Sequence, residues 1–166
     1  MYIERFIERP GELFEFLLNN VDWDERMIAR KTASFGVAYN YSQISYPFLK
    51  MPSVLLEICG KINSTIGFTP NNCLINYYLD GRSKMGFHSD QIDILEKETG
   101  VAIVSIGETR TLRFRKTENK DEIKDFELPS GSLIYMTQEV QKVWQHAIPA
   151  ADTGKGRMSL TLRKII

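Results

Sequence analysis

Histidine and cysteine are both scarce in this chain. Only two histidines, His88 and His146, and two cysteines, Cys59 and Cys73, occur among its 166 residues. Both cysteines lie inside apolar stretches, which favours buried free thiols in a reducing compartment over a disulfide framework. Any metal or acid–base chemistry that uses imidazole must therefore use these two histidines.

Net charge and long apolar runs are also missing. Lys and Arg total 21, as do Asp and Glu, so the formal net charge is zero. No apolar run approaches the roughly 18 residues that a membrane-spanning helix needs, and the charged N-terminus lacks the apolar core of a signal peptide. We therefore predict a monomeric cytoplasmic protein without membrane segments. Zero net charge also argues against nucleic-acid binding by bulk electrostatics, which leaves only a local basic patch for that role.

The ordinary composition and the length predict one folded domain over 1–166, without an internal repeat or a dividing linker. Apolar spacing predicts helices over 10–21 and 52–66, the second ended by Gly67. The segment 30–45 is typical of a strand or hairpin, and 116–124 of an exposed hairpin tip. After Pro70 the apolar period falls from four to two, which predicts short strands at 73–79, 101–106, 111–115, 126–128, 132–136, 143–148 and 157–165. This order indicates a mainly β, α+β fold: an antiparallel sandwich or barrel with the N-terminal helices packed on one side.

His88, Asp90 and His146 form a candidate metal site. If 87–90 is extended, His88 and Asp90 point to the same face with Cα atoms roughly 6.6 Å apart. His146, in another predicted strand, would complete a set of two histidines and one carboxylate, which leaves open positions on an Fe(II) ion. The alternative is that the histidines are unrelated structural residues, and a short HxD motif alone favours that interpretation.

The C-terminal strand, 157–163, alternates between polar and apolar residues. Its apolar members are Met158, Leu160 and Leu162, and its polar members are Arg157, Ser159, Thr161 and Arg163. An edge strand with a solvated polar face is one interpretation. If the apolar face packs under the helices instead, the arginines point inward, where guanidinium groups need anions. Because their Cα atoms would lie roughly 20 Å apart, we assign Arg157 to the far carboxylate of 2-oxoglutarate and Arg163 to the metal-bound end. Asn76 and Tyr78, again two residues apart, can add hydrogen-bond donors.

Seven segments now occur in the order of a known family. They are Arg30–Gly36, Tyr39–Ser42, Leu74–Gly81, His88–Asp90, Ser105–Thr111, Trp144–His146 and Arg157–Arg163. On these segments the chain resembles the AlkB family of Fe(II)- and 2-oxoglutarate-dependent dioxygenases, from about Arg30 to Ile166.

The resemblance implies a double-stranded β-helix, or jelly roll. It implies that His88, Asp90 and His146 hold the iron as the catalytic centre. It further implies 2-oxoglutarate binding by Asn76, Tyr78, Arg157 and Arg163, with Ser159 close by. In such enzymes O2 cleaves 2-oxoglutarate to succinate and carbon dioxide while a substrate C–H bond is oxidised. Many members act on an N-methyl group of a nucleobase, which then leaves as formaldehyde.

The substrate side is less closely defined. The resemblance puts Tyr39 and Tyr41 against a base in single-stranded or locally opened nucleic acid. Arg30 and Lys31 would form a phosphate-binding stripe with Arg110, Arg113, Arg115 and Lys116. However, Gln91 and Ile92 follow Asp90 where base-demethylating relatives carry acidic residues. Hydroxylation of a small molecule or protein side chain is therefore an alternative, and a non-catalytic module that senses 2-oxoglutarate is a third.

Overall fold

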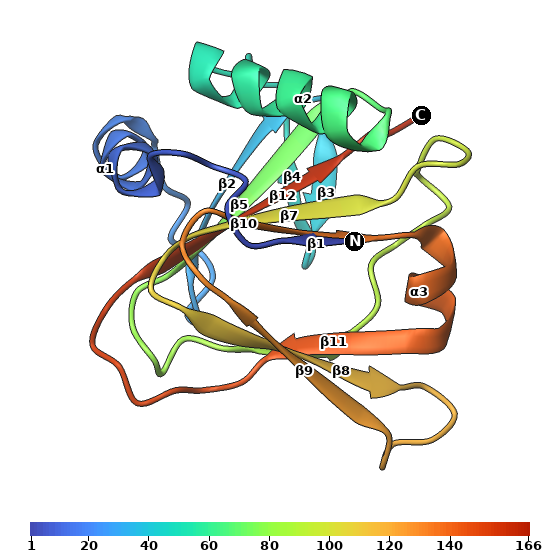
Figure 1. Cartoon of the computed structure of the whole chain (residues 1–166). Helices are drawn as coiled ribbons and strands as arrows, with labels where there is room; N and C mark the ends of the chain where they lie inside the picture. Colours follow the sequence, from blue (N-terminus) through green and yellow to red (C-terminus); the bar gives the residue numbers. More distant parts are fainter.

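The computed structural model describes residues 1–166 and contains three helices and twelve strands (Figure 1). The helices are α1 (Pro10–Asn20), α2 (Ser53–Ile66) and α3 (Gln138–Val143). The strands are β1 (Tyr2–Ile3), β2 (Lys31–Gly36), β3 (Tyr39–Tyr41), β4 (Ile44–Tyr46), β5 (Asn72–Tyr78), β6 (Met85–His88), β7 (Val101–Gly107), β8 (Arg110–Lys116), β9 (Ile123–Leu128), β10 (Ser132–Met136), β11 (Trp144–Ile148) and β12 (Arg157–Arg163).

Two antiparallel sheets face each other. The larger sheet has the strand order β1-β10-β7-β12-β5-β2, and the smaller one has the order β6-β11-β8-β9. A hairpin of β3 and β4 forms a third, two-stranded sheet. The chain crosses from the larger sheet to the smaller one and back, so neighbouring strands are seldom consecutive. This is the jelly-roll arrangement that the AlkB resemblance implies, and the predicted fold class is confirmed.

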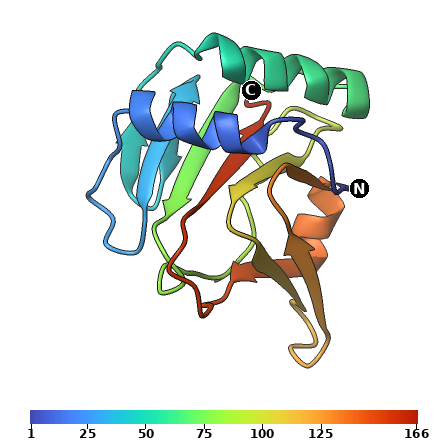
Figure 2. The same cartoon turned by 60° about the vertical axis from the view of Figure 1, so that its left-hand side comes forward.

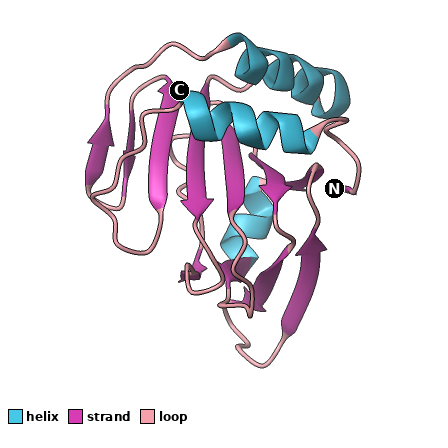
Figure 3. Cartoon of the chain, turned by 90° about the vertical axis from the view of Figure 1, so that its left-hand side faces the viewer, coloured by secondary structure: helices cyan, strands magenta, loops and turns pink.

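The helices α1 and α2 lie across the outer face of the larger sheet (Figure 2). Leu13 and Leu17 of α1 and Leu55 of α2 are buried in one apolar cluster with Met158 and other outward-facing side chains of the sheet. Burying such side chains contributes about 1.5 to 3 kcal/mol each, so this cluster fixes which face of β12 turns outward. The two N-terminal helices thus lie on one side of the larger sheet, as predicted (Figure 3).

Alternation along β12 then decides what lies between the sheets. Since Met158, Leu160 and Leu162 belong to the outer cluster, the intervening polar side chains point toward the smaller sheet. A second apolar cluster, which includes Leu112 and Phe114 of β8, fills part of the space between the sheets. The polar face of the C-terminal strand is therefore interior and not solvated.

Several local predictions are confirmed. The second helix starts after Pro52 and ends at Gly67, whose φ of +99° is the left-handed conformation that glycine adopts at low cost. The segment 30–45 contains both a strand and a hairpin, and the loop between β8 and β9 is the exposed tip that the charged sequence predicts. Cys59 and Cys73 are buried free thiols. No helix of the structure is long and apolar enough to cross a membrane.

Other elements differ from the sequence prediction. The helix α3 was not predicted, because its six residues are too few to show a helical apolar period. The short strand β1 was also missed, and it forms only by pairing with β10. The last strand ends at Arg163 instead of residue 165, where Ile165 makes only an isolated bridge to Leu95.

Candidate active site

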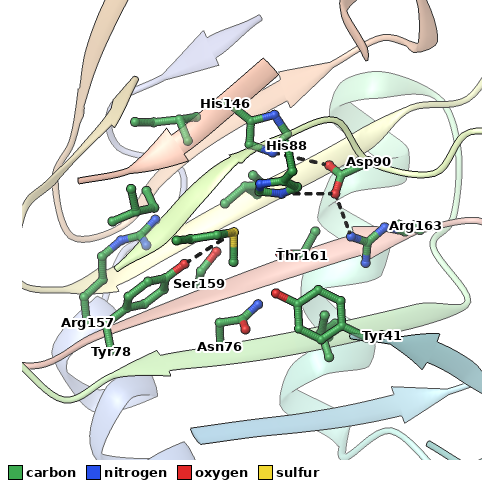
Figure 4. Close-up of a pocket in the computed structure, with 15 residues that line it drawn as sticks. Tyr41, Asn76, Tyr78, His88, Asp90, His146, Arg157, Ser159, Thr161 and Arg163 are labelled. Carbon is green, nitrogen blue, oxygen red and sulfur yellow. Dashed lines mark hydrogen bonds and ion pairs between the residues drawn. The ribbon is translucent and has the colours of Figure 1, made fainter. Parts of the chain in front are cut away.

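The two histidines meet on neighbouring strands. His88 ends β6, His146 lies in β11, and the two residues are directly opposite each other in the antiparallel register. Asp90 approaches both imidazoles: its Oδ1 is 3.9 Å from Nε2 of His88, and its Oδ2 is 3.6 Å from Nε2 of His146. Ligand atoms of the three residues all lie within 4.8 Å of one another (Figure 4). The structure thus brings together the three predicted metal ligands.

One detail of this prediction was wrong. Strand β6 ends at His88, so Asp90 lies in the following loop and not on the same strand. The loop still returns the carboxylate to the imidazoles because Asp90 is held by Gln141 of α3, which donates from Nε2 to Oδ2 over 3.2 Å. Sequence reasoning missed Gln141, since no spacing relates a glutamine in a short unpredicted helix to a carboxylate 51 residues earlier.

The protonation of the cluster suits a metal ion. Burial lowers the pKa of His146 to about 4, so this imidazole is neutral at neutral pH. Nδ1 of His88 lies 2.9 Å from the carbonyl oxygen of Gly86, which favours the tautomer that leaves Nε2 free to coordinate. Burial alone would raise the pKa of Asp90, but the charge of Arg163 lowers it below its usual value. Neutral imidazoles and an ionised carboxylate are the forms that metals bind.

Arg157 lies in the same pocket (Figure 4) and is 1% exposed. One nitrogen, Nη2, donates to Oγ of Ser105 at 2.8 Å, whereas Nε and Nη1 have no partner. Burial lowers the pKa of Arg157 to about 10, so the side chain is still a cation at neutral pH. A buried cation without an anion is costly, and an anionic ligand in the pocket would remove that cost.

Arg163, at the other end of β12, contacts a different side chain. Its Nη2 is 3.4 Å from Oδ1 of Asp90, and its Nε and Nη1 have no partner. The structure therefore places Arg163 beside the carboxylate of the metal cluster and leaves Arg157 away from it, as the spacing along the strand predicted.

The eight residues predicted for metal and cosubstrate all line one pocket: His88, Asp90, His146, Asn76, Tyr78, Arg157, Ser159 and Arg163. Asn76 and Tyr78 come from β5, the neighbour of β12. Apolar side chains such as Ile103 and Leu112 complete the wall. Sequence reasoning did not single out Ser105 of β7, which holds Arg157, because the partner of a buried guanidinium is set by strand pairing.

The predicted substrate residues separate into two groups. Tyr41 is half-buried and lines the pocket. Tyr39 is buried beside it, with the two rings stacked at a centroid distance of 6.4 Å and the guanidinium of Arg163 4.9 Å from the Tyr39 ring. The structure thus puts Tyr41 at the pocket surface and Tyr39 behind it.

Arg30 and Lys31 also differ from each other in burial. Arg30 is buried and donates to Oδ1 of Asn76, the carbonyl oxygen of Lys84 and the hydroxyl of Tyr41. Lys31 is half-buried and pairs with Glu25 at 2.6 Å. Arg30 thus connects a predicted cosubstrate residue with a predicted substrate residue, and does not lie on an open basic surface.

The predicted phosphate-binding stripe was wrong as a surface feature. Arg110 is buried and donates to three backbone carbonyls. Arg113 pairs with Asp125 across the β8–β9 hairpin, and Lys116 pairs with Glu122. Arg115 donates to Gln145 and lies over the ring of Phe87. Partners within the chain occupy these cations, so they do not form one free basic stripe.

Comparison with known proteins agrees with this geometry. Residues 14–163 match the model of the 2OG-Fe(II) oxygenase superfamily. The chain belongs to this superfamily. Fe(II), 2-oxoglutarate and O2 are the cofactor and cosubstrates that the superfamily uses, and the residues present fit them. The His-Asp-His cluster suits a metal, and the guanidinium nitrogens of Arg157 and Arg163 that have no partner suit a dicarboxylate.

Curated relatives of this chain confirm the AlkB resemblance. It is 30% identical to alkB homolog 3 of Rattus norvegicus over 92% of the chain and 59% of that protein. It is 29% identical to the DNA oxidative demethylase ALKBH2 of Mus musculus over 99% of the chain and 74% of that protein. The chain therefore spans less than two thirds of the length of alkB homolog 3.

A solved structure supports the fold assignment. The structure of OsALKBH1 superposes with a TM-score of 0.71 at 15% identity, over 98% of this chain and 95% of that one. At this identity the similarity concerns the fold alone, and it shows that this chain shares the two-sheet arrangement of that structure.

Proposed function

We propose that this protein is an Fe(II)- and 2-oxoglutarate-dependent dioxygenase that oxidatively demethylates alkylated bases in single-stranded or locally opened nucleic acid. One observation carries the proposal: a His-Asp-His cluster and a buried guanidinium without an anion share one pocket. The substrate class is supported by the relatives, which include a DNA oxidative demethylase. The products would be succinate, carbon dioxide and formaldehyde.

The roles of the pocket residues follow from their positions. His88, Asp90 and His146 would hold the iron, which supplies the oxidation of the substrate C–H bond when it is bound. Arg157 would bind the far carboxylate of 2-oxoglutarate through Nε and Nη1, the nitrogens that have no partner within the chain. Arg163 would keep the carboxylate of Asp90 ionised and interact with the metal-bound end of the cosubstrate.

The remaining residues would shape the pocket and exclude water from it. Asn76 and Ser159 offer an amide and a hydroxyl beside the arginines, and Tyr78 supplies a buried aromatic wall. Ile103, Leu112 and other apolar side chains restrict the access of water, which strengthens every charged contact inside the pocket.

The substrate base would stack on Tyr41 at the surface of the pocket, with Tyr39 supporting that ring from behind. Arg30 would fix the orientation of Tyr41 through its hydrogen bond to the phenol oxygen. We further propose that the protein acts as a monomer in the cytoplasm. Two buried free thiols support a reducing compartment.

The decisive experiment is a succinate-release screen against methylated and etheno-adducted oligonucleotides, with peptides and free amino acids as controls. We expect succinate and formaldehyde to appear together with a methylated oligonucleotide and not with the controls. An Asp90→Ala variant measures release caused by adventitious iron. Turnover of 2-oxoglutarate that no alkylated oligonucleotide increases, but a peptide or small molecule does, would replace this proposal with the hydroxylase alternative.

A further inference from the structure

Asp90 is held at two points by the side-chain amide of Gln141. The backbone N–H of Asp90 donates to Oε1 of Gln141 at 2.8 Å, and Nε2 of Gln141 donates to Oδ2 of Asp90 at 3.2 Å. Together the two hydrogen bonds form a ring that joins the side-chain amide of Gln141 to the backbone N–H and the carboxylate of Asp90. They fix the position of the Asp90 backbone and the rotation of its carboxylate at the same time.

Gln141 is itself immobilised. Its side chain is buried, and Nε2 also lies 3.6 Å from Sδ of Met136. It belongs to α3, whose first turn is capped by Thr137 and whose last residue leads directly into β11. His146 follows five residues after Gln141 on that strand. Asp90 lies in the loop after β6. The amide of Gln141 therefore connects this loop to the segment of α3 and β11 that carries His146.

No other contact to the loop after β6 holds Asp90 as Gln141 does. The hydroxyl of Ser89 donates to the carbonyl oxygen of Trp144 at 3.0 Å, but it does not touch the carboxylate of Asp90. Arg163 reaches Oδ1 at 3.4 Å, near the upper limit for a hydrogen bond. Gln141 is thus the neighbour that holds both the backbone and the carboxylate.

We infer that Gln141 is a positioning residue of the metal site, which orients the carboxylate of Asp90 before a divalent metal binds and so increases the affinity for that metal. The inference rests on the proposed function, because it takes His88, Asp90 and His146 as the ligands. A carboxylate that rotates freely loses that freedom when it coordinates, whereas one already held by an amide does not. Partners that orient metal ligands typically contribute 10- to 100-fold in metal affinity.

The test is a Co(II) titration of the whole protein, followed by the visible absorption of the bound ion, which needs no turnover. Gln141→Met keeps the length of the side chain and removes the amide. We expect its Kd for Co(II) to rise about 10- to 100-fold and the absorption bands to shift.

Gln138→Met is the matched control. Gln138 lies in the same helix, and its Nε2 also makes two hydrogen bonds, to the carbonyl oxygens of Glu96 at 3.1 Å and Thr99 at 2.9 Å. The control therefore loses the same group without touching Asp90, and we expect its Co(II) affinity to stay within about twofold of wild type. Equal affinities and equal spectra in Gln141→Met, Gln138→Met and wild type overturn the inference.

Two further variants, Gln141→Asn and Asp90→Ala, separate failure to fold and failure of the metal site from failure of the role of Gln141. If Gln141→Met does not fold by circular dichroism, Gln141→Asn decides, since it keeps the amide but is one methylene too short to reach Asp90. Wild-type binding by that variant overturns the inference. Asp90→Ala separates the two proposals: if it binds Co(II) like wild type, the proposed metal site fails. If it abolishes binding while the Gln141 variants bind normally, only the role of Gln141 fails.

Discussion

Two buried arginines in this protein share a neighbour but differ in their partners. Arg110 of β8 and Arg157 of β12 are each 1% exposed, and their guanidinium carbons lie 5.7 and 5.3 Å from the centre of the Tyr78 ring. Arg110 donates to the backbone carbonyls of Asp80, Ser83 and Pro149, which leaves only Nε unpaired. Arg157 donates to one serine hydroxyl and keeps two nitrogens unpaired.

We propose that this difference separates a structural arginine, Arg110, from a ligand-binding one, Arg157. The chain itself satisfies Arg110, which joins the loop after β5 to the segment after β11. The chain leaves two nitrogens of Arg157 without a partner, and Arg157 lines the pocket that contains His88, Asp90 and His146. Residue type and burial are the same at both positions, so the hydrogen-bond partners decide the function. The following experiments test this distinction, in order of their expected effect on turnover.

The largest effect is expected from the metal end of the pocket. Asp90→Ala removes the proposed ligand that lies near both imidazoles, so we expect turnover of 2-oxoglutarate to fall below detection. The far-ultraviolet circular dichroism spectrum should stay that of the wild type, because the residue lies in a loop. Full activity in this variant would refute the ligand assignment and with it the assignment of the pocket.

Arg157→Met should act on the cosubstrate. Loss of a charge-assisted contact costs about 2 kcal/mol or more, so we expect the KM for 2-oxoglutarate to rise at least about 30-fold. Activity should partly return at high cosubstrate concentration. Steady-state kinetics over a wide range of 2-oxoglutarate measure this effect, and an unchanged KM would mean that Arg157 is structural, like Arg110.

Tyr41→Ala should act on the nucleic acid. Stacking of a base on an aromatic ring is worth about 1 to 3 kcal/mol, so we expect the KM for a methylated oligonucleotide to rise about 5- to 150-fold. The decay of 2-oxoglutarate without substrate should not change. Tyr41→Phe keeps the ring and loses only the bond from Arg30, so it should retain most of the affinity. An equal loss in oxidation and in substrate-free decay would assign Tyr41 a structural role.

Arg110→Met should have the smallest effect on turnover and a large one on stability. It leaves three backbone carbonyls without their donor, which we expect to lower the free energy of unfolding by roughly 3 kcal/mol, measured by urea denaturation. The KM for 2-oxoglutarate should stay within about twofold of wild type in the folded protein. A rise as large as that expected for Arg157→Met would remove the distinction between the two arginines.

The sequence determined much of the site because short-range alternation governs it. Polar side chains at every second position of β12 must share one face, and the apolar residues between them must share the other. Alternation alone therefore puts Arg157, Ser159 and Arg163 on one face, and the packing of the apolar face under α1 and α2 makes that face interior. The scarcity of histidine likewise left His88 and His146 as the only imidazoles for the cluster.

Tertiary structure decided the contacts that join distant segments. Arg110 belongs to a strand whose charged residues look equally exposed in the sequence, and only the approach of three backbone carbonyls buries it. The amide of Gln141 meets Asp90 because α3 connects the two sheets at that point, which no local pattern encodes. Periodicity reports which face a residue occupies, whereas the partner of a buried polar group depends on chain crossings far apart in sequence.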